Sequence, residues 1–321
     1  CQIMAPSGVA DAMNHRIAVL LPCFNEEITV AGVVRGFREA LPEAEIYVYD
    51  NNSTDATASR AAEAGAVVRA EPRQGKGNVV RRMFADIDAD IYVMADGDGT
   101  YDPGAATEMI GRLMDETLEM VVGARLESTT GTVFRRGHRL GNVTLTRFVC
   151  WLFGAHFTDI LSGYRVFSRR FVKSFPALAS GFEIETELTI HALDLKMPVA
   201  EVAAPYTARP EGSSSKLSTW SDGLRILATI VFLFKEVKPF KFFAAVCSVL
   251  ALASLAVAYP LLGTYLETGL VPRLPTAVLA TGIMLLASLS LACGIILDSV
   301  SRARRETKRL RLLSMAPVDR F

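Results

Sequence analysis

The segment VMADGDGTYDP, residues 93–103, places three aspartates within seven positions directly after an apolar run. An apolar run of this length is typical of a buried strand, so Asp96, Asp98 and Asp102 would gather at its carboxyl end. Clustered carboxylates repel one another unless a cation or a positively charged ligand group lies among them. The segment therefore predicts a strand that ends at a site for positive charge.

Apolar runs of strand length alternate with helical segments on the N-terminal side of this cluster. The runs are RIAVLLPC at residues 16–23, EIYVYD at 45–50, AVVRA at 66–70 and DIYVMAD at 90–96. Between the first two runs, apolar residues from Val30 to Leu41 repeat at helical spacing. Strands that alternate with helices in this way form a mostly parallel, Rossmann-like sheet buried on both faces. The predicted fold class is therefore α/β.

Polar residues follow each of these runs. The motifs are PCFNEE (22–27), DNNSTD (50–55), RQGKGN (73–78) and ADGDGTYDP (95–103). Open α/β sheets bind ligands beyond the carboxyl ends of their strands, so the four motifs should line one crevice. Helix capping could explain some of these residues, such as Asp102 before Pro103. It does not account for Asp50, Asp96 and Asp98 together.

The spacing of residues in these motifs excludes an EF-hand, a P-loop and a dinucleotide-binding loop. Counted from Asp96, an EF-hand loop would need glycine at Tyr101 and glutamate at Thr107. Lys76 lacks the glycine spacing of a P-loop, and the first strand-to-helix turn lacks the GxGxxG dinucleotide motif. A hard divalent ion, held by one or two carboxylates and by phosphate oxygens, remains.

Two long segments near the C-terminus, residues 242–266 and 274–297, contain no charged side chain. Each exceeds the roughly 20 residues that cross a bilayer core, and the short link between them predicts a hairpin. Lysines before the first segment and the basic stretch at 301–313 place both ends of the hairpin in the cytoplasm by the positive-inside rule. The alternative is a pair of buried helices in a soluble core, although helices of this length rarely lack a polar face.

We expect five parts along the 321 residues. They are a flexible leader at 1–15, an α/β domain at 16–217, interfacial juxtamembrane helices at 218–241, the transmembrane hairpin at 242–297 and a basic cytoplasmic tail at 298–321. The 34 basic and 34 acidic side chains leave no net charge to attract nucleic acid. The five cysteines lack the paired spacing of a zinc site. We therefore expect a multi-pass protein of the inner (plasma) membrane, with its catalytic domain and both termini cytoplasmic.

The order of the four motifs and the DxD sequence at residues 96–98 resemble the GT-A domain of family 2 glycosyltransferases. Three later segments sharpen the resemblance, namely FTDILSGYRVFSR (157–169), GFEIETEL (181–188) and RPEGSSSKL (209–217). Followed by two apolar segments, they resemble the polyprenyl-phosphate glycosyltransferases, which are relatives of dolichyl-phosphate mannose synthase with a C-terminal transmembrane hairpin. The resemblance spans about residues 16–300 and implies a GT-A domain followed by two transmembrane helices.

The resemblance implies a side of the crevice that binds the sugar donor. Asp96 and Asp98 would hold Mg²⁺ or Mn²⁺ on the diphosphate of a nucleotide sugar, where the ion acts as a Lewis acid. The residues implied in nucleotide-sugar binding are Pro22, Asn25, Glu27, Asp50, Asn52, Lys76 and Asp96. The residues implied in catalysis are Asp96, Asp98, Arg125, Arg139 and Arg209.

The implied acceptor is polyprenyl phosphate, whose head group requires cationic partners near the membrane. Arginine suits this role because its fork matches the oxygens of a phosphate. The candidates are Arg125, Arg136, Arg139, Arg209, Ser215 and Lys216, and Arg165 in the segment SGYR is a further one. The sequence does not choose within the group at 135–139, and some of these arginines could instead be surface or ion-pairing residues.

Glutamates occur where a general base might be sought, at positions 183, 185 and 187. A phosphate monoester is already ionised near neutral pH, so this acceptor does not need a strong base. On a helix, Glu183 and Glu187 would share one face and Glu185 would point elsewhere. We assign supporting roles to Asp159, Glu183 and Glu185, such as orienting arginines or the sugar. For the glutamates, the alternative is a solvated helix face.

We therefore expect a membrane-anchored, inverting, metal-dependent transferase that moves a sugar from a UDP- or GDP-type donor to polyprenyl (undecaprenyl) phosphate by single displacement. Its product would serve cell-envelope glycan or glycoconjugate synthesis. One alternative is a transferase with a hydroxyl acceptor, whose usual Glu-Asp or QxxRW motif is not found in this sequence. Another is a non-catalytic membrane scaffold with a nucleotide-binding fold, which the intact acidic cluster argues against. Small residues in the spans, namely Ala251, Ser254, Ala287 and Ser290, would permit a homo-oligomer.

Overall fold

The computed structural model describes residues 15–127, 136–154, 157–177, 181, 183–207, 228 and 231–316. The chain divides into two compact units. The first comprises residues 1–223 together with 308–321, and the second comprises residues 224–307. The expected leader and much of the expected interfacial segment at 218–241 lie outside the described residues, so those two expectations stay predictions.

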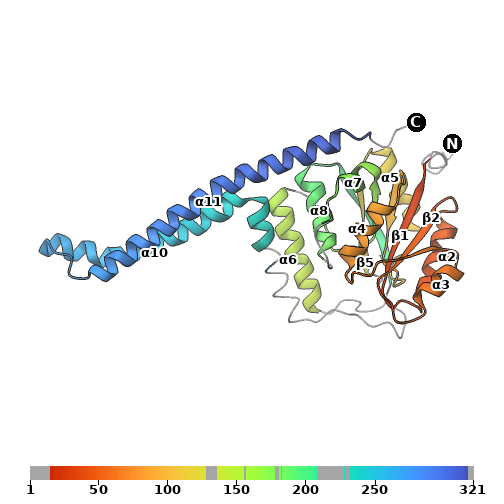
Figure 1. Ribbon diagram of the computed structural model, residues 1–321, viewed down its shortest axis with the longest axis horizontal. Helices are drawn as coiled ribbons and strands as arrows, with labels where there is room; N and C mark the ends of the chain where they lie inside the picture. Colours follow the sequence, from red (N-terminus) through yellow and green to blue (C-terminus); the bar gives the residue numbers. More distant parts are fainter. Residues whose placement is uncertain are drawn as a thin grey trace, which may run out of the picture. The chain divides into compact units, whose positions relative to one another are not determined.

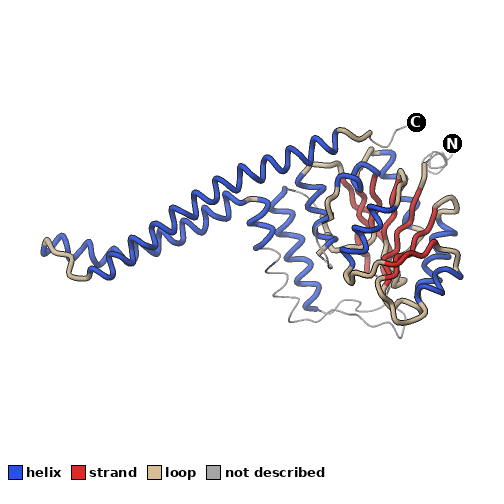
Figure 2. Tube along the Cα trace, viewed as in Figure 1, coloured by secondary structure: helices blue, strands red, loops and turns tan. Residues whose placement is uncertain are grey.

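A seven-stranded mixed sheet forms the centre of the first unit (Figures 1 and 2). Its strands are β1 (Ile17–Cys23), β2 (Glu45–Asp50), β3 (Val67–Ala70), β4 (Ile91–Met94), β5 (Met120–Glu127), β6 (Arg165–Ser168) and β7 (Val199–Tyr206). Their order across the sheet is β3-β2-β1-β4-β6-β5-β7. All neighbours pair in parallel except β6, which is antiparallel to both β4 and β5. The predicted α/β fold with a mostly parallel sheet is confirmed.

Helices connect the strands of this unit. They are α2 (Val30–Ala40), α3 (Thr57–Glu63), α4 (Lys76–Asp86), α5 (Ala105–Asp115), α6 (Arg136–Phe153), α7 (Arg169–Ser174) and α8 (Ile184–Asp194). Helices α2, α3 and α5 pack on one face of the sheet, and α4 and α7 pack on the other, where α8 adjoins α4. Successive side chains of a strand point to opposite faces, so the continuous apolar runs supply both layers.

Helix α2 shows how the sequence pattern becomes core packing. Val30, Val33, Val34 and Phe37 lie on its inner face and are buried against the sheet, as the helical spacing predicts. Burying one such side chain contributes about 1.5–3 kcal/mol. This packing holds the loop that precedes α2 against the carboxyl end of β1.

The register of the sheet aligns the strand ends that carry the polar motifs. Cys23 at the end of β1 pairs with Asp50 at the end of β2, and Leu20 pairs with Met94 at the end of β4. The turns after these strands therefore open at one edge of the sheet. This edge is where ligands of such folds bind.

The second unit contains two long helices, α10 (Pro239–Thr268) and α11 (Leu274–Leu313), the second of which extends into the first unit. Both are long and apolar enough to cross a membrane, judged by length and composition, and α11 continues without a break through the basic stretch at 301–313. Gly269, at φ 68°, ends α10 in the left-handed conformation.

Small residues bring α10 and α11 together. The Ser254 hydroxyl donates to the Ala280 carbonyl at 2.7 Å, and the Ser290 hydroxyl donates to the Phe243 carbonyl at 3.1 Å. A Cβ atom on Gly294 would approach the Cβ of Phe243 to 2.8 Å. These serines therefore serve packing within the hairpin, while an oligomer through the spans stays a prediction.

Candidate functional site

Carboxylates gather where β1, β2 and β4 end. Asp98 is buried, and its Oδ1 accepts hydrogen bonds from the Thr100 amide at 3.1 Å and the Thr100 hydroxyl at 2.7 Å. Asp50 uses Oδ2 to accept from the Ser53 amide at 3.2 Å. Its other oxygen, Oδ1, is buried without a hydrogen-bond partner among the described residues. A buried, unsatisfied acceptor at a strand end is a place where a ligand donor can bind.

Several carboxylates lie near the buried thiol of Cys23. Burial raises the pKa of this thiol well above its usual value, and the charges of Glu26, Asp96, Asp50 and Asp98 raise it further. Four carboxylates from three strand ends therefore act on one buried group. The predicted convergence of the motifs at residues 22–27, 50–55 and 95–103 agrees with this finding.

Two glycines allow the turn after β4 to sit close to its neighbours. A Cβ atom on Gly97 would overlap Sγ of Cys23. A Cβ atom on Gly163 would lie 2.6 Å from Oδ2 of Asp96. The Thr29 hydroxyl donates to the Gly97 carbonyl at 2.7 Å and fixes the turn to the start of α2. Packing therefore requires glycine between Asp96 and Asp98, at the position that the DxD pattern leaves open.

Lys76 neutralises part of the acidic cluster. Its Nζ lies 2.5 Å from Oδ1 of Asp96 and 2.5 Å from Oε1 of Glu185, and all three side chains are largely withdrawn from solvent. Burial acts to lower the pKa of Lys76, but Asp96 and Glu185 outweigh it and raise the pKa above its ordinary value. Lys76 is therefore a permanent cation that links α4 to the DxD turn and to α8.

The glutamates of α8 differ in burial. Glu185 points inward to Lys76 and is buried, whereas Glu183 lies at the N-cap position and is exposed. The sequence prediction that Glu185 faces away from Glu183 agrees with this arrangement. Of the two, only Glu185 is shown in contact with the acidic cluster, through Lys76.

The nucleotide-binding candidates of the first two motifs also hold their own loops. The Asn25 side chain accepts from the Thr54 amide at 2.8 Å, and Glu27 accepts from the Ala56 amide at 3.1 Å. These contacts join the loop after β1 to the loop after β2, beside Pro22 in β1. The geometry brings the candidates together, and their contact with a nucleotide stays a prediction.

Asn51 is a structural residue at the end of β2 that the sequence reasoning missed. Its amide donates to the carbonyls of Glu71 and Arg73 at 2.9 and 2.8 Å and accepts from the Gly75 amide at 2.7 Å. It thereby ties the end of β2 to the loop that leads to Lys76. The predicted Asn52 is exposed and donates to the Pro72 carbonyl at 2.6 Å. The Asn-Asn doublet at residues 51–52 indicated a polar strand end. It did not indicate which of the two asparagines is buried.

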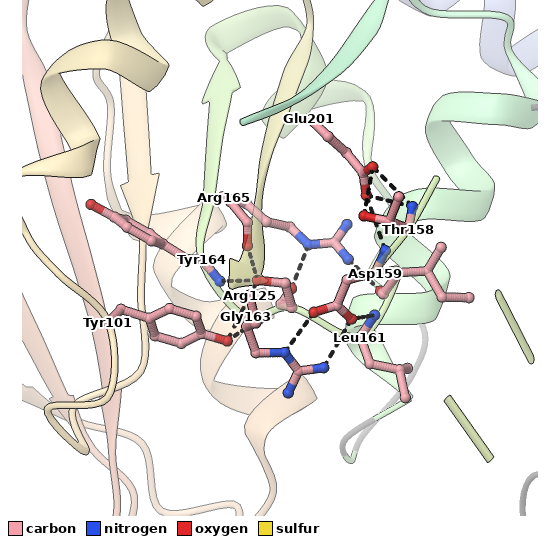
Figure 3. Close-up of polar contacts among 12 residues, drawn as sticks. Tyr101, Arg125, Thr158, Asp159, Leu161, Gly163, Tyr164, Arg165 and Glu201 are labelled. Carbon is pink, nitrogen blue, oxygen red and sulfur yellow. Dashed lines mark hydrogen bonds and ion pairs between the residues drawn. The ribbon is translucent and has the colours of Figure 1, made fainter. Parts of the chain in front are cut away.

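Arg125 in β5 is held by the carboxylate of Asp159, as Figure 3 shows, and it also lies beside an aromatic ring. Its Nε and Nη2 donate to the two oxygens of Asp159 at 2.6 and 2.8 Å, and its guanidinium carbon lies 5.6 Å from the centroid of the Tyr206 ring. Burial acts to lower the pKa of Arg125, but Asp159 raises it more, so the group stays charged. The candidate arginine and the candidate supporting aspartate therefore form one unit.

Tyr206 connects this arginine to the acidic cluster. Burial raises the pKa of Tyr206, the charge of Asp98 raises it further, and the charge of Arg125 acts to lower it. Its ring also lies 5.3 Å from that of Tyr101, whose hydroxyl accepts from the Gly163 amide at 3.0 Å. A carboxylate and a guanidinium thus act on one aromatic side chain, so the two parts of the candidate site adjoin.

Arg165 cannot bind an acceptor phosphate, and that sequence interpretation is wrong. The side chain is 0% exposed, and it donates to the Ile160 carbonyl at 2.6 Å, the Ser162 carbonyl at 2.9 Å and the Thr189 hydroxyl at 2.9 Å. Burial lowers its pKa to about 10. The charge is enclosed in the core because backbone carbonyls satisfy it.

Several candidates cannot be placed. Arg209, Ser215 and Lys216 lie outside the described residues, and only the backbone of Arg136 and Arg139, in the first turn of α6, is described. Their roles stay predictions.

The residues present fit a divalent ion only with help from a ligand. Within the described part of the chain, no group of three or more His, Cys, Asp and Glu residues is arranged to hold a metal. Asp96 and Asp98 supply two carboxylates, which suits an ion that completes its coordination with substrate phosphates and water. The unpartnered oxygen of Asp50 shows that this region has spare acceptor capacity.

Comparison with known proteins identifies the family. Residues 18–174 match the family described as Glycosyl transferase family 2. The glycosyltransferase AglJ of Haloferax volcanii is 34% identical over 231 residues, which are 72% of this chain and 76% of that protein. The chain belongs to glycosyl transferase family 2.

Two further similarities bear on the family's chemistry. This family 2 glycosyltransferase is 24% identical over 221 residues to the undecaprenyl-phosphate mannosyltransferase of Micrococcus luteus, across 62% of this chain and 86% of that protein. Its fold resembles Mycobacterium tuberculosis glucosyl-3-phosphoglycerate synthase in complex with Mn²⁺, uridine diphosphate and phosphoglyceric acid. The TM-score is 0.58 at 25% identity, over 70% of this chain and 80% of that one. The predicted GT-A fold and enzyme class are confirmed.

Proposed function

We propose that this glycosyltransferase moves a sugar from a nucleoside-diphosphate sugar to polyprenyl phosphate at a membrane surface. The observation that carries the proposal is the division between neighbouring acidic and basic groups: the guanidinium carbon of Arg125 lies 5.6 Å from the centroid of the Tyr206 ring, and the pKa of that tyrosine is raised by burial and by the charge of Asp98. A reaction between two phosphorylated substrates needs two phosphate sites. The acidic group would bind the leaving diphosphate through a metal ion, and the basic group would bind the attacking phosphate.

The donor side is assigned to the acidic cluster. Asp96 and Asp98 would hold Mg²⁺ or Mn²⁺ against the diphosphate, and such an ion neutralises the charge that the leaving group gains. Asp50, with its unpartnered oxygen, would accept a hydrogen bond from the nucleoside. Lys76 keeps Asp96 in place at 2.5 Å and adds a fixed positive charge near the diphosphate. Pro22, Asn25, Glu27 and Asn52 would complete the nucleotide site.

The acceptor side is assigned to Arg125, together with Arg136, Arg139, Arg209, Ser215 and Lys216. A phosphate oxygen of the acceptor would attack the anomeric carbon as the bond from that carbon to the diphosphate breaks. The electron pair leaves with the nucleoside diphosphate, and the configuration inverts. The attacking oxygen is already ionised, so no side chain has to remove a proton. This agrees with Glu185 being engaged by Lys76.

Two findings support the lipid acceptor. The first is the length and apolar character of α10 and α11, which we propose anchor the chain in the inner membrane with the catalytic domain and both termini cytoplasmic. The second is the name of the Micrococcus luteus relative, an undecaprenyl-phosphate mannosyltransferase. An anchored enzyme and a lipid acceptor both diffuse within the plane of the membrane. The phosphate of the acceptor therefore stays at a fixed height relative to the catalytic domain.

The test is transfer of radiolabelled sugar from a panel of UDP- and GDP-sugars to undecaprenyl phosphate by the full-length protein in detergent. Reactions contain Mg²⁺, Mn²⁺ or EDTA, and parallel reactions contain undecaprenol, which has a hydroxyl in place of the phosphate. We expect label in the lipid phase only with undecaprenyl phosphate and a metal ion. Transfer to undecaprenol, or none to either lipid from a folded protein that binds UDP or GDP, would contradict the proposal.

A further inference from the structure

The segment Thr158–Ser162 carries the carboxylate that holds Arg125. It lies between α6 and β6, and Asp159 within it is buried (Figure 3). Oδ1 of Asp159 accepts from Arg125 and also from the Leu161 amide at 3.2 Å, which curls the segment into a turn. The position of the Arg125 fork therefore depends on where this turn is held.

Glu201 in β7 holds the amide side of the turn. Its two carboxylate oxygens accept from the Thr158 amide at 3.0 and 2.9 Å, and Oε1 accepts from the Asp159 amide at 3.1 Å. The Thr158 hydroxyl donates to Oε2 at 3.1 Å. Hydrogen bonds to an ionised acceptor are about twice as strong as neutral ones. A single side chain thus binds the turn through three donors.

Arg165 in β6 holds the carbonyl side of the same turn. Its guanidinium donates to the Ile160 and Ser162 carbonyls, and Thr189 of α8 accepts a third hydrogen bond. The turn therefore lies between a carboxylate that binds its amides and a guanidinium that binds its carbonyls. Each charge meets the backbone dipoles of opposite sign, which accounts for an arginine enclosed in the core.

We propose that Glu201 and Arg165 are positioning residues for the acceptor phosphate: they fix the 158–162 turn, the turn fixes Asp159, and Asp159 fixes the Arg125 fork. This inference rests on the proposed function, in which Arg125 binds that phosphate. Neither residue touches the substrate. Residues 18–174 match the family, so Glu201 lies beyond the matched segment.

The chemistry of Glu201 makes the proposal specific. A glutamine at this position would keep one acceptor oxygen and turn an NH₂ group toward backbone amides, so donors would face donors. An aspartate would keep the charge with a shorter reach. We therefore expect Glu201→Gln to release the turn and Glu201→Asp to retain part of the function. Misplacing a binding group by about 1 Å can cost up to roughly 100-fold.

The test measures binding of undecaprenyl phosphate and of undecaprenol to the full-length protein in detergent, with binding of UDP and GDP in the presence of Mn²⁺ as a second measurement. For Glu201→Gln we expect affinity for undecaprenyl phosphate to fall about 10- to 100-fold, with the other affinities unchanged. Glu201→Asp should fall between the wild type and Glu201→Gln. The matched control is Glu108→Gln, which removes an exposed glutamate from α5 and should change nothing.

Three results separate the inference from the proposed function on which it rests. If Arg125→Ala binds undecaprenyl phosphate as tightly as the wild type does, the acceptor assignment fails and the inference falls with it. If Arg125→Ala weakens binding and Glu201→Gln does not, only the inference is overturned. Equal loss of lipid and nucleotide affinity in Glu201→Gln would also overturn it, because a merely structural role predicts that result.

Thr158→Val, which removes one donor and keeps the backbone contacts, gives a milder variant should Glu201→Gln not fold. We expect its affinity for undecaprenyl phosphate alone to fall by about two- to fivefold, and an unchanged affinity would overturn the inference.

Discussion

The two parts of the candidate site treat their charges in opposite ways. At the ends of β1, β2 and β4, the carboxylates of Glu26, Asp50, Asp96 and Asp98 act together on Cys23, and one oxygen of Asp50 has no partner among the described residues. Around β5 and the 158–162 turn, by contrast, Arg125 is paired with Asp159, and Glu201 is saturated by the turn. The first part, which we call the donor part, therefore has an acceptor oxygen without a partner. In the second, the acceptor part, the charged groups named here bind one another or the backbone.

The difference indicates what each part expects from its ligand. Lys76 offsets only part of the negative charge of the clustered carboxylates, so the donor part would gain stability when a metal ion and a diphosphate bind. A guanidinium already fixed in place loses little freedom when a phosphate arrives, so the acceptor part would bind through preorganisation. Helix α8 serves both parts, because it supplies Glu185 to Lys76 and Thr189 to Arg165.

The largest expected effect is on catalysis, from Asp98→Asn. Loss of this charge should lower metal-dependent transfer by about 1,000-fold, since it would remove one of the two proposed ligands of an ion that would stabilise the leaving group. Affinity for undecaprenyl phosphate should not change if the two parts are separate. Initial rates and lipid binding are measured on the same preparation.

Asp102→Asn is the matched control for Asp98→Asn. Asp102 belongs to the same segment, but it is exposed and accepts from the Gly104 amide at 2.9 Å. It should keep near-normal turnover. Equal losses in the two variants would mean that the turn matters only for folding, and normal turnover of Asp98→Asn in EDTA would remove the metal assignment.

The next effect is on stability, from Arg165→Met. The change leaves the Ile160 and Ser162 carbonyls without their donor in the core, and each buried acceptor left unsatisfied costs about 1–3 kcal/mol. The melting temperature in detergent should fall by roughly 6–15 °C. A melting temperature like that of the wild type would show that the turn does not depend on this arginine.

The burial of Arg165 could not be predicted from the sequence. The apolar runs predicted β1, β2 and β4 because hydrophobic continuity directly reflects burial on both faces. The run in β6 begins with an arginine, and charged residues are rarely buried unless a specific partner satisfies them. That partner is the backbone of a turn, which leaves no pattern in side-chain types. The same reason hides Glu201 and the choice of Asn51 over Asn52.

The convergence of the acidic motifs was predictable for a different reason. Parallel strands carry their carboxyl ends to one edge, so Asp50, Asp96 and Asp98 could be placed together from topology alone. The contact between Lys76 and Glu185 needed α8, whose place beside α4 follows from packing rather than from strand order. Topology therefore gives the convergence of the aspartates, and tertiary packing gives the contacts of Lys76 and Arg165 with α8.

A smaller effect is expected from pH, through His191 on α8. Burial and, to a smaller extent, the charge of Lys308 together lower the pKa of His191 to about 3. Below the unfolded value of about 6.5, the unfolded chain binds a proton that the folded chain does not. Stability should therefore fall by up to about 1.4 kcal/mol per pH unit between pH 6.5 and 3.

Because α8 supports both parts, acidification in this range should weaken UDP and undecaprenyl phosphate binding together. The measurement is the melting temperature and both affinities from pH 7 to pH 5. His191→Phe, which keeps an aromatic ring beside Phe171 and Phe175, should flatten the pH dependence of the melting temperature. An unchanged slope in this variant would assign the effect to other groups.

The smallest expected effect is the one that tests the comparison most directly, because it sets Asp50→Asn against Asp159→Asn. Removing one of four neighbouring carboxylates relieves repulsion, so Asp50→Asn should leave the free energy of unfolding unchanged or raise it by about 1 kcal/mol, while UDP affinity falls. Asp159→Asn should instead lower stability, since Arg125 loses its charged partner inside the fold. Melting curves of both variants in the same detergent, with and without UDP and Mn²⁺, decide the matter. If both aspartates prove equally stabilising, the carboxylates of the donor part are as well satisfied as Asp159 is. The unpartnered oxygen of Asp50 then does not indicate a ligand.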